Sequence, residues 1–249
     1  MVFGPIGRQR LPTLLEAELD LSVLNPAERD MLQTDAWFGG FSDAQQQQLL
    51  QQGRRRVLSA GQPLFSRGAP FCGIYVVLQG QLLISGLHPS GQQALLTLLT
   101  PGQWLGEIAW FDQMPRTHDV QALTDSQLLQ FPKAALQQLV QQDPLWWQRF
   151  GQLLTVKLRL LFVELEDRAL LPAQQRLARR LCQLSQDQQL QIPLQQEQLG
   201  QLLSLSRQTT NQLLRQLAQA GLLQTRYGTI EVLNRPALLQ LAQHGTLVS

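Results

Sequence analysis

The spacing of apolar residues changes along the 249-residue chain and divides it into three parts. Between residues 34 and 142 the apolar runs are short, as in IYVVLQG (74–80), QLLISG (81–86) and ALLTLLTPG (94–102), and glycine or proline stands between them. Short apolar runs at brief, regular intervals are typical of a small all-β barrel or sandwich. The pattern therefore predicts a β domain in the first half of the chain.

The spacing becomes helical from residue 132 onward. The run PKAALQQLVQQ (132–142) predicts one helix, and Asp143-Pro144 is a start signal for a second helix that extends to about residue 170. Proline 172 ends that helix, because proline cannot continue the hydrogen-bond ladder. We therefore expect a domain boundary near residues 168–173.

The long helix carries a stripe of leucines at steps of four, three and four: Leu154, Leu158, Leu161 and Leu165. This is the spacing of a two-stranded coiled-coil seam, although a helix that packs on its own domain shows a similar stripe. We expect Phe150 and Trp147 to extend the stripe toward the N-terminus. Because such a stripe is long for a small domain, dimerisation is the favoured interpretation.

Residues 195–217, QQEQLGQLLSLSRQTTNQLLRQL, predict two short helices joined by a turn at Ser204-Leu205. Gly200 lets the second helix approach the first closely, and the Ser206 hydroxyl is placed to cap the second helix. The exposed face of this second helix presents Arg207, Gln208, Asn211 and Gln212, with Arg215 one turn later. Arginine pairs with guanine and glutamine with adenine, so the pattern indicates a helix-turn-helix that meets the major groove.

The segment after these helices adds to the same interpretation. Gly221 ends the second helix, and LLQTRYGTIEVL (222–233) predicts a hairpin that turns at Tyr227-Gly228, which would form a wing. Residues 173–235 hold seven arginines against three carboxylates, whereas the whole chain has a net charge of only +2. A basic C-terminal module suggests a polyanionic partner, with a solvated basic face as the alternative.

Several other classes of protein are poorly supported. Cys72 and Cys182 lie far apart with no CxxC pair, so the sequence offers no disulfide framework, zinc site or iron–sulfur cluster. No signal peptide and no apolar run near 18 residues is seen, and we expect a cytoplasmic protein that does not contact a membrane. The three histidines are scattered and no nucleophile–base constellation is evident, so we expect neither a haem sensor nor an enzyme.

With these features in place, the chain resembles regulators of the cyclic-AMP receptor protein/fumarate–nitrate regulator (Crp/Fnr) family. The resemblance covers roughly residues 35–235 and rests on LFSRG (64–68), IYVVLQGQL (74–82), LTPGQWLGEIAWFDQMPRTHDVQAL (99–123) and LSRQTTNQLLRQL (205–217). It implies an α+β chain with a cyclic-nucleotide-binding β-barrel of the jelly-roll (double-stranded β-helix) type, a long dimerisation helix and a C-terminal winged helix-turn-helix. We divide the chain accordingly into 1–33 (a helical extension without an assigned role), 34–142 (effector domain), 143–171 (dimerisation helix) and 172–249 (DNA-binding domain).

The resemblance also implies a ligand site. In cyclic-nucleotide-binding domains a Gly-Glu-Leu-Ala segment, a short helix and a Pro-Arg-Ser/Thr/Ala segment form a phosphate cassette. Gly106, Glu107, Ile108 and Ala109 together with Pro115-Arg116-Thr117 match it. By this match Arg116 and Thr117 would bind the cyclic phosphate and Glu107 would accept the ribose 2′-hydroxyl. The alternative is that Glu107 and Arg116 pair with each other and only brace the loop.

Two regions depart from the family pattern. Where the cyclic-AMP receptor contacts adenine with adjacent Thr and Ser, this chain has Leu161 and Phe162, of which only Phe162 could stack on a base. In the recognition helix, Gln208 and Gln212 replace a glutamate and an arginine that read the family's shared half-site, whereas Arg207 and Thr209 match the receptor. We therefore expect the usual pose of cyclic AMP to be altered and the half-site sequence to differ.

These observations together predict a homodimeric, effector-responsive bacterial transcription regulator, an activator by its family. Its partners would be palindromic promoter DNA, a second copy of the chain and RNA polymerase, and its effector a cyclic nucleotide such as cyclic AMP or cyclic GMP, or a related small anion. The DNA contacts would come from seven residues: Ser206, Arg207, Gln208, Thr209, Asn211, Gln212 and Arg215. The alternatives are a ligand-independent regulator with a vestigial pocket, and a cyclic-nucleotide-binding module that regulates another protein.

Overall fold

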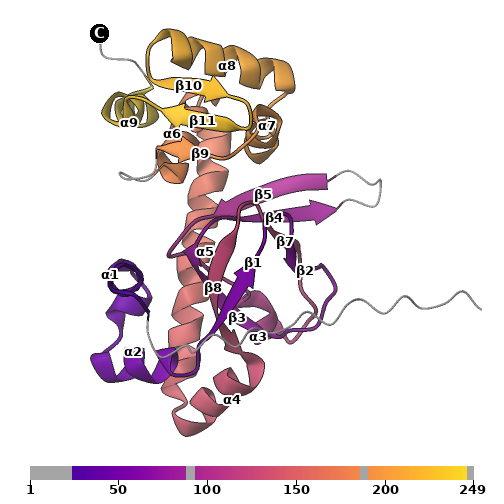
Figure 1. Cartoon of the computed structure of the whole chain (residues 1–249), viewed down its shortest axis with the longest axis vertical. Coiled ribbons are helices and arrows are strands. Elements are labelled where there is room, and N and C mark those ends of the chain that lie inside the picture. The colour runs from indigo at the N-terminus through magenta and orange to yellow at the C-terminus, as the bar shows by residue number, and fades with distance from the viewer. Residues whose placement is uncertain (1–23, 88–92, 186–189, 246–249) are drawn as a thin grey trace, which may run out of the picture.

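The computed structural model describes residues 24–87, 93–185 and 190–245. Within these ranges the chain forms a β-roll and a smaller C-terminal domain, and one long helix runs beside the roll and leads into that domain (Figure 1). Most of the predicted N-terminal extension, residues 1–23, lies outside the described residues.

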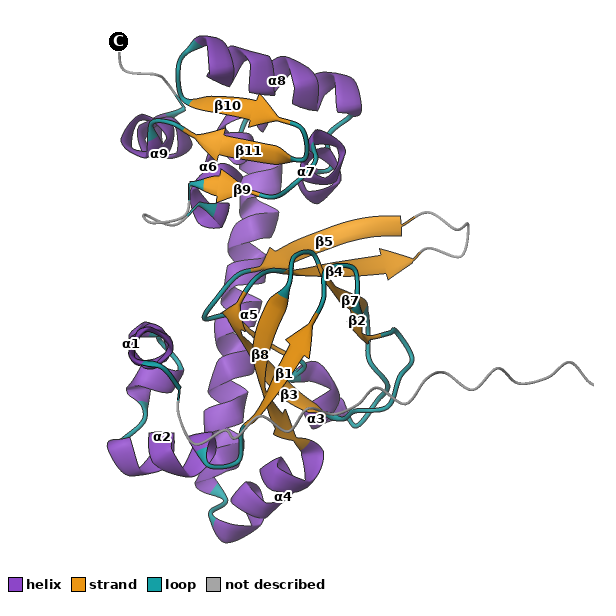
Figure 2. Cartoon of the chain, in the orientation of Figure 1, coloured by secondary structure: helices purple, strands orange, loops and turns teal. Residues whose placement is uncertain are grey.

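The roll consists of two antiparallel four-stranded sheets that face each other (Figure 2). The first sheet has the order β1 (Arg54–Leu58), β8 (Ser126–Pro132), β3 (Gly73–Gln79) and β6 (Trp104–Leu105). The second has the order β2 (Pro63–Phe65), β7 (Asp119–Ala122), β4 (Leu82–Leu87) and β5 (Gln93–Leu99). This is the jelly-roll arrangement rather than a closed barrel, and the predicted α+β fold class is confirmed.

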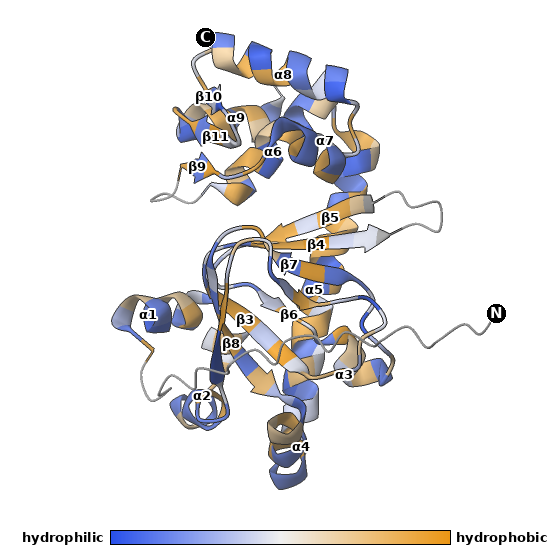
Figure 3. Ribbon diagram, turned by 45° about the vertical axis from the view of Figure 1, so that its right-hand side comes forward, coloured by the Kyte–Doolittle hydropathy of each residue, from blue (hydrophilic) through white to orange (hydrophobic). Residues whose placement is uncertain are grey.

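Alternating side chains of the strands supply two separate cores. One face of the first sheet joins the second sheet in a cluster that includes Tyr75, Val77 and Leu128. The opposite face, with Ile74 and Val76, packs against helices. Strand β3 is therefore buried on both sides, which explains why its side chains are apolar on both faces. Figure 3 shows hydrophobic residues along β3 and β8 of this sheet.

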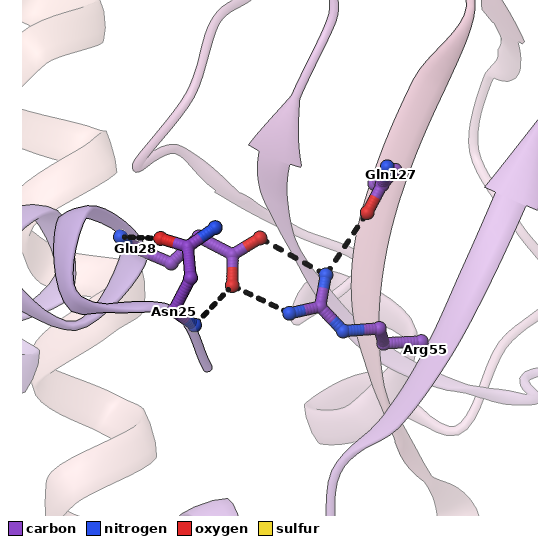
Figure 4. Close-up of polar contacts among 4 residues, drawn as sticks. All are labelled: Asn25, Glu28, Arg55 and Gln127. Atoms are coloured by element: carbon purple, nitrogen blue, oxygen red, sulfur yellow. Dashed lines mark hydrogen bonds and ion pairs between the residues drawn. The ribbon is translucent and has the colours of Figure 1, made fainter. Parts of the chain in front are cut away.

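Helices cover the outer face of the first sheet. They are α1 (Pro26–Thr34), the short 3₁₀ helix η1 (Phe38–Gly40), α2 (Asp43–Leu50) and α4 (Lys133–Gln142). A buried ion pair fixes α1, because Glu28 binds Arg55 of β1 at 2.5 Å (Figure 4). Glu28 also completes the helix's capping box with Asn25, and Arg55 donates to Gln127 of β8. The polar network therefore ties the start of the described chain to the sheet.

The long helix α5 (Leu145–Leu170) buries apolar side chains against the roll in its first turns, namely Trp146, Phe150 and Leu153. The prediction that Phe150 extends the leucine stripe is wrong, since Phe150 is buried in the core of its own roll. Trp147 stacks on Trp110, with the ring centroids 5.0 Å apart, but remains 42% exposed. Aromatic rings of this size gain most when they are buried next to other rings, and the roll offers those partners. The later turns of α5 keep their apolar side chains exposed.

The C-terminal domain holds four helices and a three-stranded sheet within the described residues. They are α6 (Ala173–Leu184), β9 (Gln191–Ile192), α7 (Gln196–Leu203), α8 (Arg207–Gln219), β10 (Leu223–Arg226), β11 (Thr229–Val232) and α9 (Arg235–His244). The hairpin β10–β11 turns at Tyr227-Gly228, as predicted for a wing. Leu83, Leu95 and Leu98 of the β4–β5 hairpin share one apolar cluster with this domain, so the two domains are in contact. None of the described helices is long and apolar enough to cross a membrane.

Candidate effector site and nucleic-acid interface

The turn after β6 positions the segment with the predicted cassette residues. Gly106 has a φ of +97°, and a Cβ atom added there would lie 2.8 Å from the Arg116 Nη1 atom and 3.0 Å from the Gly73 carbonyl oxygen. Only glycine tolerates both the left-handed conformation and this close approach. The short helix α3 (Ile108–Asp112) follows directly, and the chain returns to the same place at Arg116.

Arg116 is directed into the protein rather than into solvent. The residue is only 3% exposed, and its guanidinium donates to the carbonyl oxygens of Gly106 at 2.9 Å and Gly73 at 2.6 Å. The Cζ atom lies 4.2 Å from the ring centre of Phe65 and 4.9 Å from that of Phe71. Two aromatic faces and two carbonyl groups therefore hold the guanidinium in one orientation.

The charge of Arg116 has no counter-ion within the described part of the chain. No described carboxylate forms an ion pair with it, and its buried Nε atom has no hydrogen-bond partner. A buried cation that lacks a negative partner is costly, and a bound anion would remove that cost. The guanidinium is also well suited to an anion with two or three oxygens, because its N–H groups form a planar fork.

Glu107 is paired with the long helix and not with Arg116. Lys157 of α5 donates to the Glu107 carboxylate at 2.7 Å and to the carbonyl oxygen of Trp104 at 2.5 Å. Glu107 itself is 3% exposed. The alternative in which Glu107 and Arg116 brace each other is therefore wrong, because each of the two residues has other partners.

Lys157, the ion-pair partner of Glu107, is a residue of this site that the sequence did not predict. The chain has only two lysines, and this one lies four residues before Leu161, where a side chain shares a helix face with it. A single cation beside an apolar stripe is a weak signal, but it could have suggested a buried carboxylate partner. The ion pair joins the loop that carries the cassette to the helix with the exposed leucines.

The remaining cassette residues occupy less enclosed positions. Ala109 is buried, Ile108 is 43% exposed, and the Thr117 hydroxyl lies 2.9 Å from Nδ1 of His118. Burial, together with the positive charge of Arg67, lowers the pKa of His118, so this ring is mostly neutral near pH 7.

Leu161 and Phe162 lie on α5, one turn beyond Lys157, with exposed fractions of 52% and 57%. The structure does not bring either side chain into contact with Arg116. They belong to a group of exposed apolar side chains on the later turns of α5: Val156, Leu158, Leu160, Leu161, Phe162, Val163, Leu165 and Leu170. So many exposed apolar side chains on one helix indicate a surface that another molecule covers.

A separate cavity lies between α1, α2 and β1. Its volume is about 600 Å³, its floor includes Leu32, Phe38 and Leu129, and glutamines form much of its rim. None of the cassette residues lines it. The cavity and the Arg116 site are therefore different places in the roll.

The second helix of the predicted helix-turn-helix is α8, and it begins where the sequence indicates. The Ser206 hydroxyl accepts from the Thr209 backbone N–H at 3.1 Å, which is a helix N-cap. A Cβ atom at Gly200 of α7 would lie 2.7 Å from the Thr210 hydroxyl, so glycine is required for the close contact of the two helices. The packing fixes which face of α8 points outward.

That outward face carries the predicted DNA-reading residues. Five of the seven are exposed, namely Ser206, Arg207, Gln208, Gln212 and Arg215, while Thr209 and Asn211 are half-buried. Helix α8 lies at the end of the molecule farthest from α4 (Figure 1), and nothing in the described chain covers this face. Tyr227 at the tip of the wing is fully exposed as well.

Residues that could hold a metal are not evident. Within the described residues no group of three His, Cys, Asp or Glu side chains could ligate an ion. The charged side chains of the site are the Arg116 guanidinium and the Glu107 carboxylate, which is paired with the Lys157 ammonium group.

Comparison with known proteins agrees with this geometry. The family description "Cyclic nucleotide-binding domain" matches residues 55–143, and "Crp-like helix-turn-helix domain" matches residues 175–241. The "Cyclic AMP receptor protein" of Thermus thermophilus is 29% identical over 190 residues, which cover 76% of this chain and 88% of the relative. The "CRP-like cAMP-activated global transcriptional regulator" of Mycobacterium tuberculosis is 28% identical over 169 residues, or 65% of this chain and 75% of the relative.

Solved structures share the fold at lower identity. FixK2 from Bradyrhizobium japonicum superposes with a TM-score of 0.63 at 19% identity and covers 76% of this chain and 96% of its own. The c-di-GMP responsive global regulator CLP of Xanthomonas campestris has a TM-score of 0.62 at 22% identity and covers 77% and 99%. At these identities the likeness concerns the fold alone. The two matched families coincide with the roll and with the winged helix-turn-helix.

Proposed function

Since the chain belongs to the Crp/Fnr family of effector-responsive transcription regulators, we propose that it binds promoter DNA as a homodimer under the control of a cyclic nucleotide. The observation that carries the proposal is the buried Arg116 guanidinium, which no described carboxylate neutralises. It lies beside a loop that Lys157 ties to α5. A ligand that binds there would act directly on the contact between the roll and the long helix.

In the proposed complex the cyclic phosphate lies against Arg116 and Thr117. Backbone N–H groups of Gly106, Ile108 and Ala109 add donors around it. Glu107 accepts the ribose 2′-hydroxyl, and the hydrogen bond from Lys157 holds the Glu107 carboxylate in one orientation. Relatives that carry "cAMP-activated" in their names support a nucleotide of this class.

The base would meet the exposed part of α5. Leu161 and Phe162 offer no hydrogen bond to a purine, but the Phe162 ring can stack on one. Stacking responds to the area of a base and not to its hydrogen-bonding edge. We therefore expect cyclic AMP and cyclic GMP to bind with affinities that differ by less than about tenfold, whereas a pocket with hydroxyl groups discriminates more strongly.

Dimerisation would use the exposed leucines of α5. Leu158, Leu161 and Leu165 are each at least half exposed in the single chain. Exposed apolar side chains at this spacing are typical of a surface that binds another protein. Two copies of α5 packed along this stripe would bury it and would bring the two effector sites to opposite sides of one coiled coil. A ligand that shifts α5 in one protomer then changes the position of the other.

The dimer would present two copies of α8 to DNA. Ser206, Arg207, Gln208, Thr209, Asn211, Gln212 and Arg215 form the proposed interface. Two-fold symmetry implies a palindrome with half-sites separated by about one helical turn, roughly 34 Å. Gln208 and Gln212 favour adenine over the bases that a glutamate and an arginine would select. We therefore expect the half-site to differ from TGTGA, the half-site sequence that the family shares. RNA polymerase would be the protein partner at the promoter.

A thermal-shift experiment tests the effector site. The wild-type protein and Arg116→Ala are heated with cyclic AMP, cyclic GMP, cyclic di-GMP and 2-oxoglutarate, and Arg215→Ala serves as the matched arginine control. We expect at least one cyclic nucleotide to stabilise the wild type and the control but not Arg116→Ala. Equal stabilisation of Arg116→Ala, or no stabilisation by any of the four, would contradict the proposal.

One observation favours a second candidate. Arg116 already donates to two carbonyl groups, and Glu107 already has an ion-pair partner, so both residues have structural roles without a ligand. A ligand-independent regulator with a vestigial pocket would show wild-type DNA affinity that none of the four compounds changes. A module that regulates another protein is less well supported, because α8 and the wing are both present and exposed. We infer that the chain is not an enzyme.

A further inference from the structure

Cys72 lies against the guanidinium of the proposed effector site. It is an exposed free cysteine directly before β3, and its Sγ atom is 3.3 Å from the Arg116 Nη2 atom and 3.1 Å from the Tyr75 hydroxyl. Burial, and then the contact with Cys72, raises the pKa of Tyr75 well above its ordinary value, so the hydroxyl stays protonated. Two donors can therefore point at one accessible sulfur atom.

A second observation indicates that a negative group is missing at this place. Arg116 is only 3% exposed, and its Nε atom is buried without a hydrogen-bond partner. No carboxylate among the described residues forms an ion pair with it. The sulfur is the one side-chain acceptor that Arg116 contacts in the described part of the chain. A sulfur group with negative charge would complete the electrostatics of the site.

We propose that Cys72 is an oxidation-sensitive thiol, and that its oxidised form places a negative oxygen against Arg116 in the position that a ligand's phosphate would use. The inference has two parts. The reactivity of the thiol depends only on Cys72, Tyr75 and Arg116. The competition with a phosphate rests on the proposed function.

The oxidant is a peroxide, for which hydrogen peroxide is the simplest example. The Cys72 thiolate attacks one peroxide oxygen, a sulfur–oxygen bond forms, and the oxygen–oxygen bond breaks. Hydroxide leaves and takes up the proton that the thiol released, so the thiol and hydrogen peroxide give a sulfenic acid and water. Sulfur loses two electrons and the peroxide gains them. Deprotonation of the sulfenic acid would leave a sulfenate oxygen beside the guanidinium.

The structure also provides an internal control. Cys182 lies in the C-terminal core, and burial raises the pKa of its thiol, which makes this thiol unreactive at neutral pH. A cation or a hydrogen-bond donor next to an accessible sulfur has the opposite effect on reactivity. The two cysteines of the chain should therefore react at very different rates.

The first experiment measures oxidation of the full chain by hydrogen peroxide at pH 7, with dimedone to trap sulfenic acid and peptide mass spectrometry to locate it. We expect Cys72 to be labelled at least about tenfold faster than Cys182, and about fivefold faster than free N-acetylcysteine under the same conditions. Arg116→Gln should lower the Cys72 rate to that of N-acetylcysteine, and Tyr75→Phe should lower it less. A wild-type Cys72 rate no higher than that of N-acetylcysteine overturns the proposal, even if Arg116→Gln fails to fold.

The second experiment separates this inference from the proposed function. Binding of cyclic AMP and cyclic GMP is measured by calorimetry before and after peroxide treatment, for the wild type and for Cys72→Ser. We expect oxidation to weaken binding by about tenfold or more in the wild type and not in Cys72→Ser. Unchanged binding after complete Cys72 labelling overturns the competition. If neither nucleotide binds the reduced protein, the proposed effector is wrong, while the labelling rates still decide whether Cys72 is a reactive site.

Discussion

At the scale of single residues, charge decides what the roll can bind. Arg116 and Lys157 are both cationic and Glu107 is the one carboxylate that pairs with either of them among the described residues. The cluster therefore keeps one unneutralised positive charge inside the domain. Since charges are costly to bury alone, an anion bound at Arg116 would lower the cost of burying its charge.

The ion pair of Lys157 gives a prediction for stability. Lys157→Gln leaves the buried Glu107 carboxylate without its counter-ion, and we expect the free energy of unfolding to fall by about 2 kcal/mol. Urea unfolding at pH 7 measures this change in the free energy of unfolding. Lys133→Gln, at the only other lysine and on α4, is the matched control and should change stability by less than about 0.5 kcal/mol. Equal effects of the two substitutions would show that the pair contributes nothing.

The Glu28 network predicts an acid-sensitive contact. Burial alone would raise the Glu28 pKa, but hydrogen bonds from Arg55 and from the Asn25 backbone lower it below its ordinary value. A carboxyl whose folded pKa is depressed adds stability above its unfolded pKa, and this stability is lost as the pH falls through the folded value. The wild type should therefore lose stability progressively below about pH 4.5.

Removing the carboxylate tests this pH dependence. Glu28→Gln should lower the free energy of unfolding at pH 7 by roughly 2–3 kcal/mol and should make it less sensitive to acid. Urea unfolding from pH 3.5 to pH 7 measures both effects. Glu197→Gln, at an exposed carboxylate on α7, is the matched control and should reproduce the wild-type curve. A Glu28→Gln curve parallel to that of the wild type would contradict the assignment.

At the scale of elements, α5 has two different halves. Its first turns bury Trp146 and Phe150 in the roll, whereas its later turns expose leucines that nothing in the described chain covers. The stripe in the sequence is continuous, so spacing alone could not divide it between the two partners. In the first half of α5, Phe150 and Trp147 contact the ring of Trp110 in the roll, so this half packs on its own domain.

The exposed half of α5 predicts the effect of a charged residue in the seam. In a dimer, Leu161→Asp would remove apolar contacts from both chains and place two carboxylates in the interface. Loss of about 3 kcal/mol or more corresponds to a dimer that is weakened by at least about 100-fold. Light scattering coupled to size-exclusion chromatography should find a monomer. Leu170→Asp, an exposed leucine off the seam, should remain dimeric.

Helix α8 yields a prediction for the salt dependence of DNA binding. Arg215 lies on the exposed face one turn beyond Gln212 and is placed to contact phosphate. Arg215→Ala should reduce the slope of log affinity against log salt by about one unit for each protomer, and it should weaken binding to all sequences alike. Fluorescence anisotropy at several salt concentrations measures the slope. A loss confined to one base position would instead assign Arg215 to base recognition.

The sequence predicted the helices and strands more completely than the contacts within the candidate site. The strands β3, β4 and β5, the wing and the Ser206 cap follow from local signals, because glycine turns and capping hydroxyls act over a few residues. Lys157 and Cys72 are far from Glu107 and Arg116 in the sequence. Only the packing of α5 and β3 around α3 brings them together, so no local pattern could have indicated these contacts.

At the scale of the whole molecule, the C-terminal domain rests on the roll. Arg180 of α6 donates to the Thr97 hydroxyl of β5 at 3.1 Å and pairs with Glu164 of α5 at 3.4 Å. The β4–β5 leucines extend the same contact into the apolar core of that domain. Both α5 and the β4–β5 hairpin therefore support the C-terminal domain that carries α8 (Figure 1).

The central claim is that occupancy of the Arg116 site controls DNA binding. It is tested most directly by fluorescence anisotropy on a palindrome that the protein itself selects from random DNA. Affinity is measured with and without saturating cyclic AMP or cyclic GMP, for the wild type and for Arg116→Gln. We predict that at least one nucleotide changes the DNA affinity of the wild type by about tenfold and leaves that of Arg116→Gln unchanged. Identical affinities of the wild type with and without both nucleotides would contradict the account.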